Sequence, residues 1–473
     1  MLGIDDYGIY NVVGGIVTMF SFLNSAMVAS SQRFISFELG RRDNERLIKV
    51  FSISMSVHLM LAFLILVLSE TVGLWFLNTK LNIPVDRMVA ANWVYQCSII
   101  AFLINIISVP YNACIVAHEH MKAFGYFGIL EVLLKLVIVY ILLIIQLDKL
   151  ITYAVLIVLM AGFMRLIYGY YCRRNFVECH FYIVSDRHLM RDMFAFAGWS
   201  FIGNFGFSVK DQGLNILINM FFNVAVNAAK GIASQVGTVV NGFAQNFQMA
   251  INPQITKRYA AGDVVSMMKL VFYGCKYSVF LMLIIVLPLI MASDHILHLW
   301  LGDVAEYTTG FLQLTLVVAL IDSIVNPITT ALQATGKIKR FQIIISIIMI
   351  SNIPLAWLWL TFDLNPYIVI FVAGITSVVA VAIRLMLLHE LVPYSYKAYI
   401  IQVGLPILIT VPIAALISWG IYKVYSPTFL GLLCYGVTSV LTSASVIYLL
   451  GLNLTEKKTV NSAIATSVSK IFK

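Results

Sequence analysis

Charged residues are scarce in this chain. Asp, Glu, Lys and Arg make up only 11% of its 473 residues, whereas hydrophobic residues make up 61% and the mean hydropathy is +0.92. Soluble domains carry roughly 25% charged residues, so this scarcity excludes a soluble globular protein. The composition predicts an all-α polytopic membrane protein.

The sequence also lacks recognisable catalytic motifs. It contains no H-E-x-x-H, no P-loop and no nucleophile motif, and the predicted outer loops 70–88 and 293–307 are short. We therefore predict that the protein is not an enzyme and carries no cofactor. Without an ATP site, an ion gradient or the lipid gradient must drive any transport.

Cysteine is sparse and does not form a framework. The six cysteines include no C-x-x-C pair, which argues against structural disulfides. Cys114-x-x-x-His118-x-His120 and His295-x-x-His298 have spacings that a metal could use. Neither comes with convincing further ligands, and both fall at predicted loops. The sequence therefore favours interfacial histidines over a metal site.

Long apolar runs are what the chain has in abundance. A membrane span needs about 20 mainly apolar residues. Thirteen segments fit this description, counting the more polar stretch between 193 and 251: 11–32, 47–69, 89–112, 124–146, 150–171, 193–222, 224–251, 267–292, 308–332, 340–361, 366–388, 400–422 and 428–451.

Lys and Arg are unevenly divided between alternate loops. One set of loops holds 20 of them and the other holds 4, Lys80, Arg87, Lys149 and Lys423. Because basic residues collect on the cytoplasmic side, the C-terminus is predicted to be inside and Met1 outside. The net charge of +9 is explained by this topology and by anionic lipid, so no nucleic acid partner is predicted.

Two parts of the sequence resemble each other. Residues 110–124 align without gaps on residues 327–341, at an offset of 217 (327 − 110 = 217), and Asp43 aligns on Asp263 at an offset of 220 (263 − 43 = 220). Shared Pro, Lys and Asp residues at a nearly constant offset favour an internal duplication over chance similarity of apolar sequence.

The repeat leads to an expected domain organisation. The second half begins with the segment 193–222, whose counterpart in the first half would lie upstream of Met1, so we expect this chain to lack one N-terminal helix. The predicted fold is two pseudo-symmetric six-helix bundles, the first missing its first helix, followed by two further helices. The expected divisions are 1–192, 193–392 and 393–473, the last including a cytoplasmic tail.

Three stretches together resemble a known family. Residues 2–13 (LGIDDYGIYNVV), 252–263 (NPQITKRYAAGD) and 334–339 (ATGKIK) look like the polysaccharide flippases that export O-antigen and capsule, within the multidrug/oligosaccharidyl-lipid/polysaccharide exporter superfamily. The likeness runs over nearly the whole chain. It implies two six-helix bundles forming a V around a central cavity, and alternating access that moves a polyprenyl-pyrophosphate-linked oligosaccharide across a bacterial inner membrane.

The same resemblance implies partners. These are the lipid-linked oligosaccharide itself, membrane lipids, a proton or sodium ion, and proteins of surface polysaccharide or lipopolysaccharide assembly.

One stretch, Phe207 to Lys230, carries an unusual polar pattern. Asp211 and four asparagines recur every fourth residue, which on a helix places them on one slowly drifting face. Inside a bilayer such a face must meet protein or water. We therefore predict that this stretch and the next form a wall of a hydrated path. The polar residues concerned are Asp211, Asn215, Asn219, Asn223, Asn227, Gln235, Asn241, Gln245, Asn246 and Gln248.

A flippase interpretation assigns roles to these residues. A pyrophosphate with a sugar chain needs cations and hydrogen-bonding groups along its route through the membrane. The alternative is that Lys210 and Asp211 pair with other helices and hold the bundle together. The functional roles are pyrophosphate attraction by Lys210 and Lys230, bonding of sugar hydroxyls by Asn215, Asn219 and Asn227, and control of charge state or proton coupling by Asp211.

Other intramembrane polar residues have two interpretations each. Arg165 faces the cavity or reaches the cytoplasmic headgroups. Arg33 guides the lipid headgroup or reflects topology alone. Asp322 precedes Pro327, where a structural kink is favoured over a functional hinge. Lys276 is interpreted as a packing or interface residue.

Two other functions compete with flipping. A cation-coupled multidrug exporter would favour an acid-dominated cavity, whereas the deep charges here are mostly Lys and Arg. A membrane enzyme such as a glycan polymerase would need catalytic carboxylates or His in a sizeable outer loop, which the sequence lacks.

Overall fold

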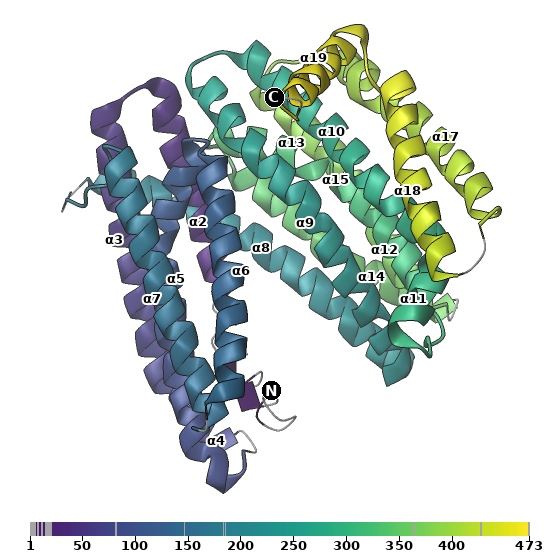
Figure 1. The fold of residues 1–473 in the computed structure, drawn as a ribbon. Coiled ribbons are helices and arrows are strands. Elements are labelled where there is room, and N and C mark those ends of the chain that lie inside the picture. The colour runs from purple at the N-terminus through teal and green to yellow at the C-terminus, as the bar shows by residue number, and fades with distance from the viewer. Residues whose placement is uncertain are drawn as a thin grey trace. The chain divides into compact units, whose positions relative to one another are not determined.

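Over the residues that the computed structural model describes, all regular secondary structure is helical (Figure 1). These are residues 21–471 apart from 81–82, 146, 183, 185, 363–364 and 426–427, together with residues 6, 9–10 and 13–14. Most of residues 2–13 and the first half of the predicted span 11–32 lie outside the described part. By packing, the chain divides into two compact units.

The first unit comprises residues 1–205 with the short pieces 256–262 and 338–343. Its helices are α2 (Ser21–Arg41), α3 (Asn44–Leu68), the π-helical turn η1 (Ser69–Gly73), α4 (Leu74–Lys80), the 3-10 turn η2 (Val85–Arg87), α5 (Met88–Ala117), α6 (Met121–Ile144), α7 (Lys149–Asn175) and the first part of α8 (Arg187–Phe221).

Helix α5 is the centre of the first unit. It packs against α7, α2 and α3, and Figure 1 shows α3, α5 and α7 lying side by side. Val94 and Tyr95 of α5 are fully buried against Leu150 of α7. The Tyr95 hydroxyl donates to the carbonyl of Ser69 at 2.7 Å, which satisfies a polar group inside an apolar core. The hydroxyl group of this buried ring therefore has a hydrogen-bond partner.

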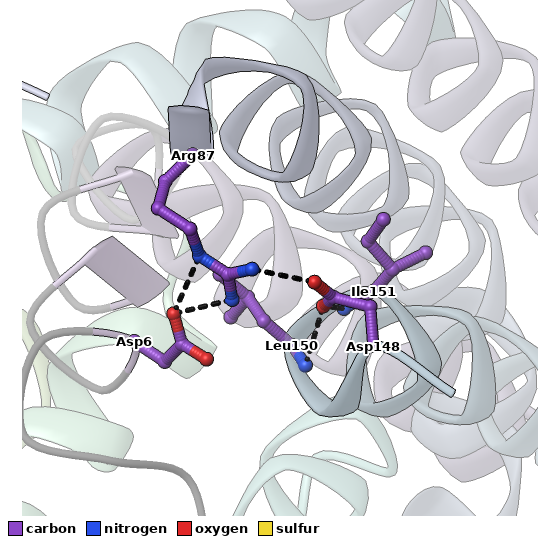
Figure 2. A network of polar contacts seen from close by, with 5 residues as sticks. All are labelled: Asp6, Arg87, Asp148, Leu150 and Ile151. Carbon is purple, nitrogen blue, oxygen red and sulfur yellow. Dashed lines mark hydrogen bonds and ion pairs between the residues drawn. The ribbon is translucent and has the colours of Figure 1, made fainter. Parts of the chain in front are cut away.

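A charged network closes the end of this unit that the topology predicts to be outside (Figure 2). The Arg87 guanidinium donates to Asp6 through Nε at 2.9 Å and to Asp148 through Nη1 at 2.6 Å. Asp148 also accepts the amide protons of Leu150 and Ile151, both at 3.0 Å, and so caps α7. One arginine thus joins three separate segments of the chain.

The second unit comprises residues 206–255, 263–337 and 344–473. It holds the rest of α8, most of α9 (Val224–Ala260), α10 (Val264–Met291), α11 (Ser293–Leu301), α12 (Thr308–Asp322), α13 (Val325–Ala334), most of α14 (Lys339–Phe362), α15 (Ile368–Leu391), α16 (Tyr396–Tyr399), the π-helical turn η3 (Ile400–Gly404), α17 (Leu405–Tyr422), α18 (Phe429–Val446), the π-helical turn η4 (Ile447–Gly451) and α19 (Leu454–Ile471).

Helix α10 organises the second unit. It contacts α12 and α13 in the main core and α17 and α18 in a second cluster (Figure 1). In that second cluster Phe280 and Leu283 of α10 are buried against Ala414 and Ile447. Residues 393–473 therefore pack on the second unit. The divisions expected at 192 and 392 concern the repeat, which this packing does not test.

Each of the thirteen predicted segments overlaps a helix. Within the described residues, ten helices are long and apolar enough to cross a membrane. Helices α2, α8 and α9 are not among the ten because their sequences are more polar, although α8 has 35 residues and α9 has 37. The prediction of an all-α membrane protein with about thirteen long helices is confirmed.

The turn geometry repeats at the offsets seen in the sequence. Asp43 and Asp263 are both helix N-caps, each accepting an amide proton three residues ahead, at 2.9 and 3.0 Å. The residue before each cap is left-handed: φ is 59° at Arg42 and 79° at Gly262 (262 − 42 = 220). The shared aspartates of the repeat are therefore explained by helix capping.

A second pair of left-handed turns shows the other offset. Glu119 has φ of 63° and Gly336 has φ of 74° (336 − 119 = 217). The helices before them differ, because α5 continues through Pro110 while α12 ends at Asp322 and α13 begins at Val325, just before Pro327. The kink predicted at Pro327 is thus an interruption of the helix.

Candidate functional site in the second unit

Two buried lysines lie on the consecutive helices α8 and α9. Lys210 is 8% exposed and Lys230 is 5% exposed. The Lys230 ammonium donates to the side-chain oxygen of Asn215 at 2.5 Å. It also interacts electrostatically with Asp211 and Lys210. Residues that the sequence singled out on two different helices are therefore brought together.

The turn between these helices explains why Lys230 lies close to Asn215. Helix α8 ends at Phe221, and the side-chain oxygen of Asn223 accepts the amide proton of Val226 at 3.0 Å at the start of α9. The chain reverses at this point, so Leu214 and Ile218 of α8 share one buried cluster with Ala229 of α9. The reversal also lets Lys230 reach back to Asn215.

The expectation that five polar residues share one helical face is wrong. Only Asp211, Asn215 and Asn219 lie on α8, whereas Asn223 is in the turn and Asn227 belongs to α9. The physical reason is that the Asn223 side chain caps the new helix instead of continuing the old one. Asp211 and Asn219 are exposed, and Asn215 and Asn227 are half-buried.

The amides on α8 also bond one another. Asn219 donates to the carbonyl of Asn215 at 3.3 Å, and the Asn215 amide lies 3.5 Å from the side-chain oxygen of Gln212. The Asp211 carboxylate and the Asn219 amide are exposed, so protein packing does not cover either of them. These side chains supply both hydrogen-bond donors and acceptors.

A second charged group lies beside Lys210. Asp322, at the end of α12, interacts electrostatically with Lys210 and with Arg384 on α15. Arg384 is only 7% exposed. Sequence reasoning did not single out Arg384, although a lone arginine inside the apolar segment 366–388 is the signal that would have found it.

One polar residue predicted to line the path is buried inside the second unit. Gln248 is 2% exposed and donates to the hydroxyl of Ser278 at 2.8 Å and to the carbonyl of Ser323 at 2.7 Å. Its oxygen accepts from Asn326 at 2.9 Å. Gln248 therefore ties α9 and α10 to the interruption between α12 and α13, and its predicted position on a hydrated wall is wrong. Gln235, Gln245 and Asn246 are exposed and Asn241 is half-buried.

Arg33 and Arg165 belong to the first unit. The Arg33 guanidinium lies 4.6 Å from the ring centres of both Phe34 and Phe37, and Arg165 lies 4.1 Å from the ring centre of Tyr111. Each is half-buried and held by cation–π contacts inside its own unit. Their predicted role in substrate binding stays a prediction.

Comparison with solved structures places the fold. An outward-facing multidrug resistance MATE family transporter of the MOP superfamily matches with a TM-score of 0.70 at 15% identity, covering 83% of this chain and 90% of that one. A MATE structure in complex with MaD3S gives 0.70 at 14% identity, covering 82% and 89%. A MOP superfamily transporter from Pyrococcus furiosus, described as having a binding pocket of reverse polarity that suggests a different function, gives 0.65 at 15%, covering 83% and 94%.

Sequence comparison gives a second line of evidence. The MatE family model matches residues 200–358, which include α9 and most of α8. The model described as polysaccharide biosynthesis protein matches residues 1–258. No curated protein matches the chain.

Fold and family matches together define the class of protein. The chain is a multi-pass helical membrane protein with the fold of the MATE structures. Because the polysaccharide biosynthesis protein model covers more than half of its length, the chain belongs to that family.

Proposed function

We propose that this transporter flips a polyprenyl-pyrophosphate-linked oligosaccharide across the bacterial inner membrane by alternating access, with its C-terminus in the cytoplasm. The observation that carries the proposal is the pair of buried lysines, Lys210 and Lys230, beside the amides of α8. Membership of the polysaccharide biosynthesis protein family supports a glycan substrate.

The charge of the pair suits an anionic headgroup. Lys230 is bonded to a neutral amide, so its positive charge is not cancelled by a direct carboxylate partner in that contact. A pyrophosphate that replaces the Asn215 oxygen would gain charge-assisted hydrogen bonds, which are about twice as strong as neutral ones. Asn215 would then be released to bond the first sugar, while Asn219 and Asn227 extend the polar surface.

Asp211 and Asp322 supply the opposite charge. The exposed Asp211 interacts electrostatically with Lys230, and Asp322 interacts electrostatically with Lys210. Protonation of either carboxylate would strengthen the net positive field and favour substrate entry. A proton is the coupling ion that this arrangement accommodates most directly, and sodium is the alternative.

The test is export of surface glycan in cells that depend on this protein. Lys210→Met and Lys230→Met should each reduce export about tenfold to a hundredfold, the effect of losing one hydrogen bond to a charged group. Lys337→Met, at an exposed turn position, is the matched control and should export normally. Glycan is measured by gel and lipid-linked intermediate by mass spectrometry, with membrane levels of each variant checked by blotting.

Accumulation of the lipid-linked intermediate separates transport from synthesis. The lysine variants should accumulate it on the cytoplasmic face. Normal glycan levels in both variants, at normal protein levels, would remove these lysines from the site.

A cation-coupled multidrug exporter is the second candidate. The match of the MatE model to residues 200–358 favours it. Energised vesicles that extrude a cationic dye, with loss of extrusion in Asp211→Asn and not in Lys230→Met, would support that function over flipping.

A further inference from the structure

A compact group of metal-binding side chains lies in the first unit, outside the site described above. One ligand atom each of Cys114, Glu178 and Cys179 lies within 4.8 Å of the other two. Both thiols are fully buried, and Glu178 is 3% exposed. The three residues come from the end of α5 and from the segment that follows α7, at the face that the basic loops predict to be cytoplasmic.

A third cysteine adjoins the group. Cys172, in the last turn of α7, is fully buried and interacts electrostatically with Cys179. Its other contact is the carbonyl of Tyr111, at 3.5 Å. The Cys172 thiol is not one of the three ligand atoms that lie within 4.8 Å of one another, so its side chain would have to turn to become a fourth ligand.

A histidine holds the carboxylate from the other side. His118 lies 2.5 Å through Nε2 from Glu178, and its ring stacks on Phe176 at 4.2 Å between centres. A hydrogen-bonded partner behind a ligating carboxylate is the usual second layer of a metal site. His120 is turned away and bonds the hydroxyl of Tyr171 at 2.9 Å, so it is not a ligand candidate.

The donor set selects the kind of metal. Thiolates with one carboxylate suit zinc and other thiophilic cations, whereas magnesium and calcium take oxygen ligands only. A tetrahedral zinc with bonds of about 2.3 Å to sulfur holds its ligand atoms about 4 Å apart, so small side-chain rotations would complete the site. The Arg165 guanidinium acts electrostatically on Cys172 and would offset part of the negative charge.

We propose that Cys114, Cys172, Cys179 and Glu178 bind one thiophilic divalent cation, zinc by its ligand chemistry. The bound ion fastens the end of α5 to the end of α7 and to the segment leading into α8. Buried thiols also occur as plain core residues.

Metal content of the purified protein tests the proposal. The detergent-solubilised chain, kept reduced, is stripped with a chelator, incubated with Zn²⁺ and measured by mass spectrometry of metals. We expect about one zinc per chain in the wild type. Affinity should fall at least tenfold in Cys179→Ser, since one of four ligands is replaced. Cys275→Ser, which alters a buried thiol of the second unit, should keep the metal.

Co²⁺ and alkylation provide readouts that do not depend on the variant folding. Co²⁺ bound to the wild type should show thiolate-to-cobalt charge-transfer bands and the visible bands of a tetrahedral site. Zn²⁺ should slow alkylation of Cys114, Cys172 and Cys179 in the folded wild type but leave Cys275 unaffected. Absence of the thiolate–cobalt bands, no such protection, or equal zinc in wild type and Cys179→Ser would each overturn the proposal.

Discussion

Two buried lysines of the second unit have hydrogen-bond partners of different charge. Lys276 on α10 is 3% exposed and binds both carboxylate oxygens of Glu456, at 2.5 and 2.7 Å. Lys230 on α9 is 5% exposed and donates to the neutral amide oxygen of Asn215. Similar burial thus accompanies an ion pair in one case and a charge–dipole contact in the other.

The difference distinguishes a lysine with a structural role, Lys276, from a lysine that could bind an anion, Lys230. In the Lys276–Glu456 pair both charges are buried and mutually satisfied, so an incoming anion would have to break an ion pair. At Lys230 an anion would displace only an amide. Glu456 is further fixed by a capping box, because it accepts the amide proton of Asn453 at 2.8 Å and donates its own amide proton to the Asn453 side chain at 2.9 Å.

Removing Lys276 should have the largest effect on stability. Lys276→Met leaves the Glu456 carboxylate buried without its cation, which costs about 3–5 kcal/mol. Unfolding in detergent, followed by circular dichroism against denaturant, measures the loss. The double variant Lys276→Met/Glu456→Gln should recover most of it, and a single variant as stable as the wild type would show that this pair is not structural.

Weakening the cap that orients Glu456 should have a smaller effect. Asn453→Ala removes the side-chain acceptor at the start of α19 and should cost about 1 kcal/mol in the free energy of unfolding. Thr455→Ala, an exposed change in the same turn, is the control and should be neutral. Equal losses from both changes would mean that helix propensity matters here and capping does not.

Lys230→Met should affect unfolding least among the buried positions. It removes a buried charge whose contact is neutral, so the free energy of unfolding should change by less than about 1 kcal/mol. The same denaturant experiment measures it, and glycan export provides the contrast. A loss as large as that of Lys276→Met would abolish the distinction between the two lysines.

A carboxylate at the membrane edge gives the weakest effect. Burial acts to raise the pKa of Asp148, but hydrogen bonds from the Ile151 amide and Arg87 outweigh it and hold this pKa below its ordinary value of 3.8. A lowered pKa in the folded state stabilises the protein above about pH 4, and this contribution is lost as the pH falls further.

This contribution is measurable as a slope. Between pH 5 and about pH 3 the unfolding temperature should fall less in Asp148→Asn than in the wild type. Asp86→Asn, at an exposed neighbouring position, should follow the wild type. A parallel slope in the wild type and Asp148→Asn would show that the Arg87 network contributes nothing to acid stability.

The repeat illustrates how far sequence patterns reach. The shared aspartates predicted a duplication, and both prove to be helix caps with left-handed residues before them. Capping depends on residues a few positions apart, so a local pattern reveals it. The amide series on α8 was misjudged because a four-residue spacing fits both a continuing helix and a helix–turn–helix, and Asn223 is a good cap as well as a tolerable helix residue.

Hydropathy by itself determined most of the long helices, because a span of about 20 apolar residues is a local property that no tertiary contact needs to complete. It also determined the class of protein. Only the tertiary structure decided which polar groups pair with each other. Lys276 pairs with Glu456, 180 residues away in the sequence, and His118 pairs with Glu178, 60 residues away. A buried charge requires a partner, but helical periodicity shows only which face carries the charge and says nothing of the residue packed against it.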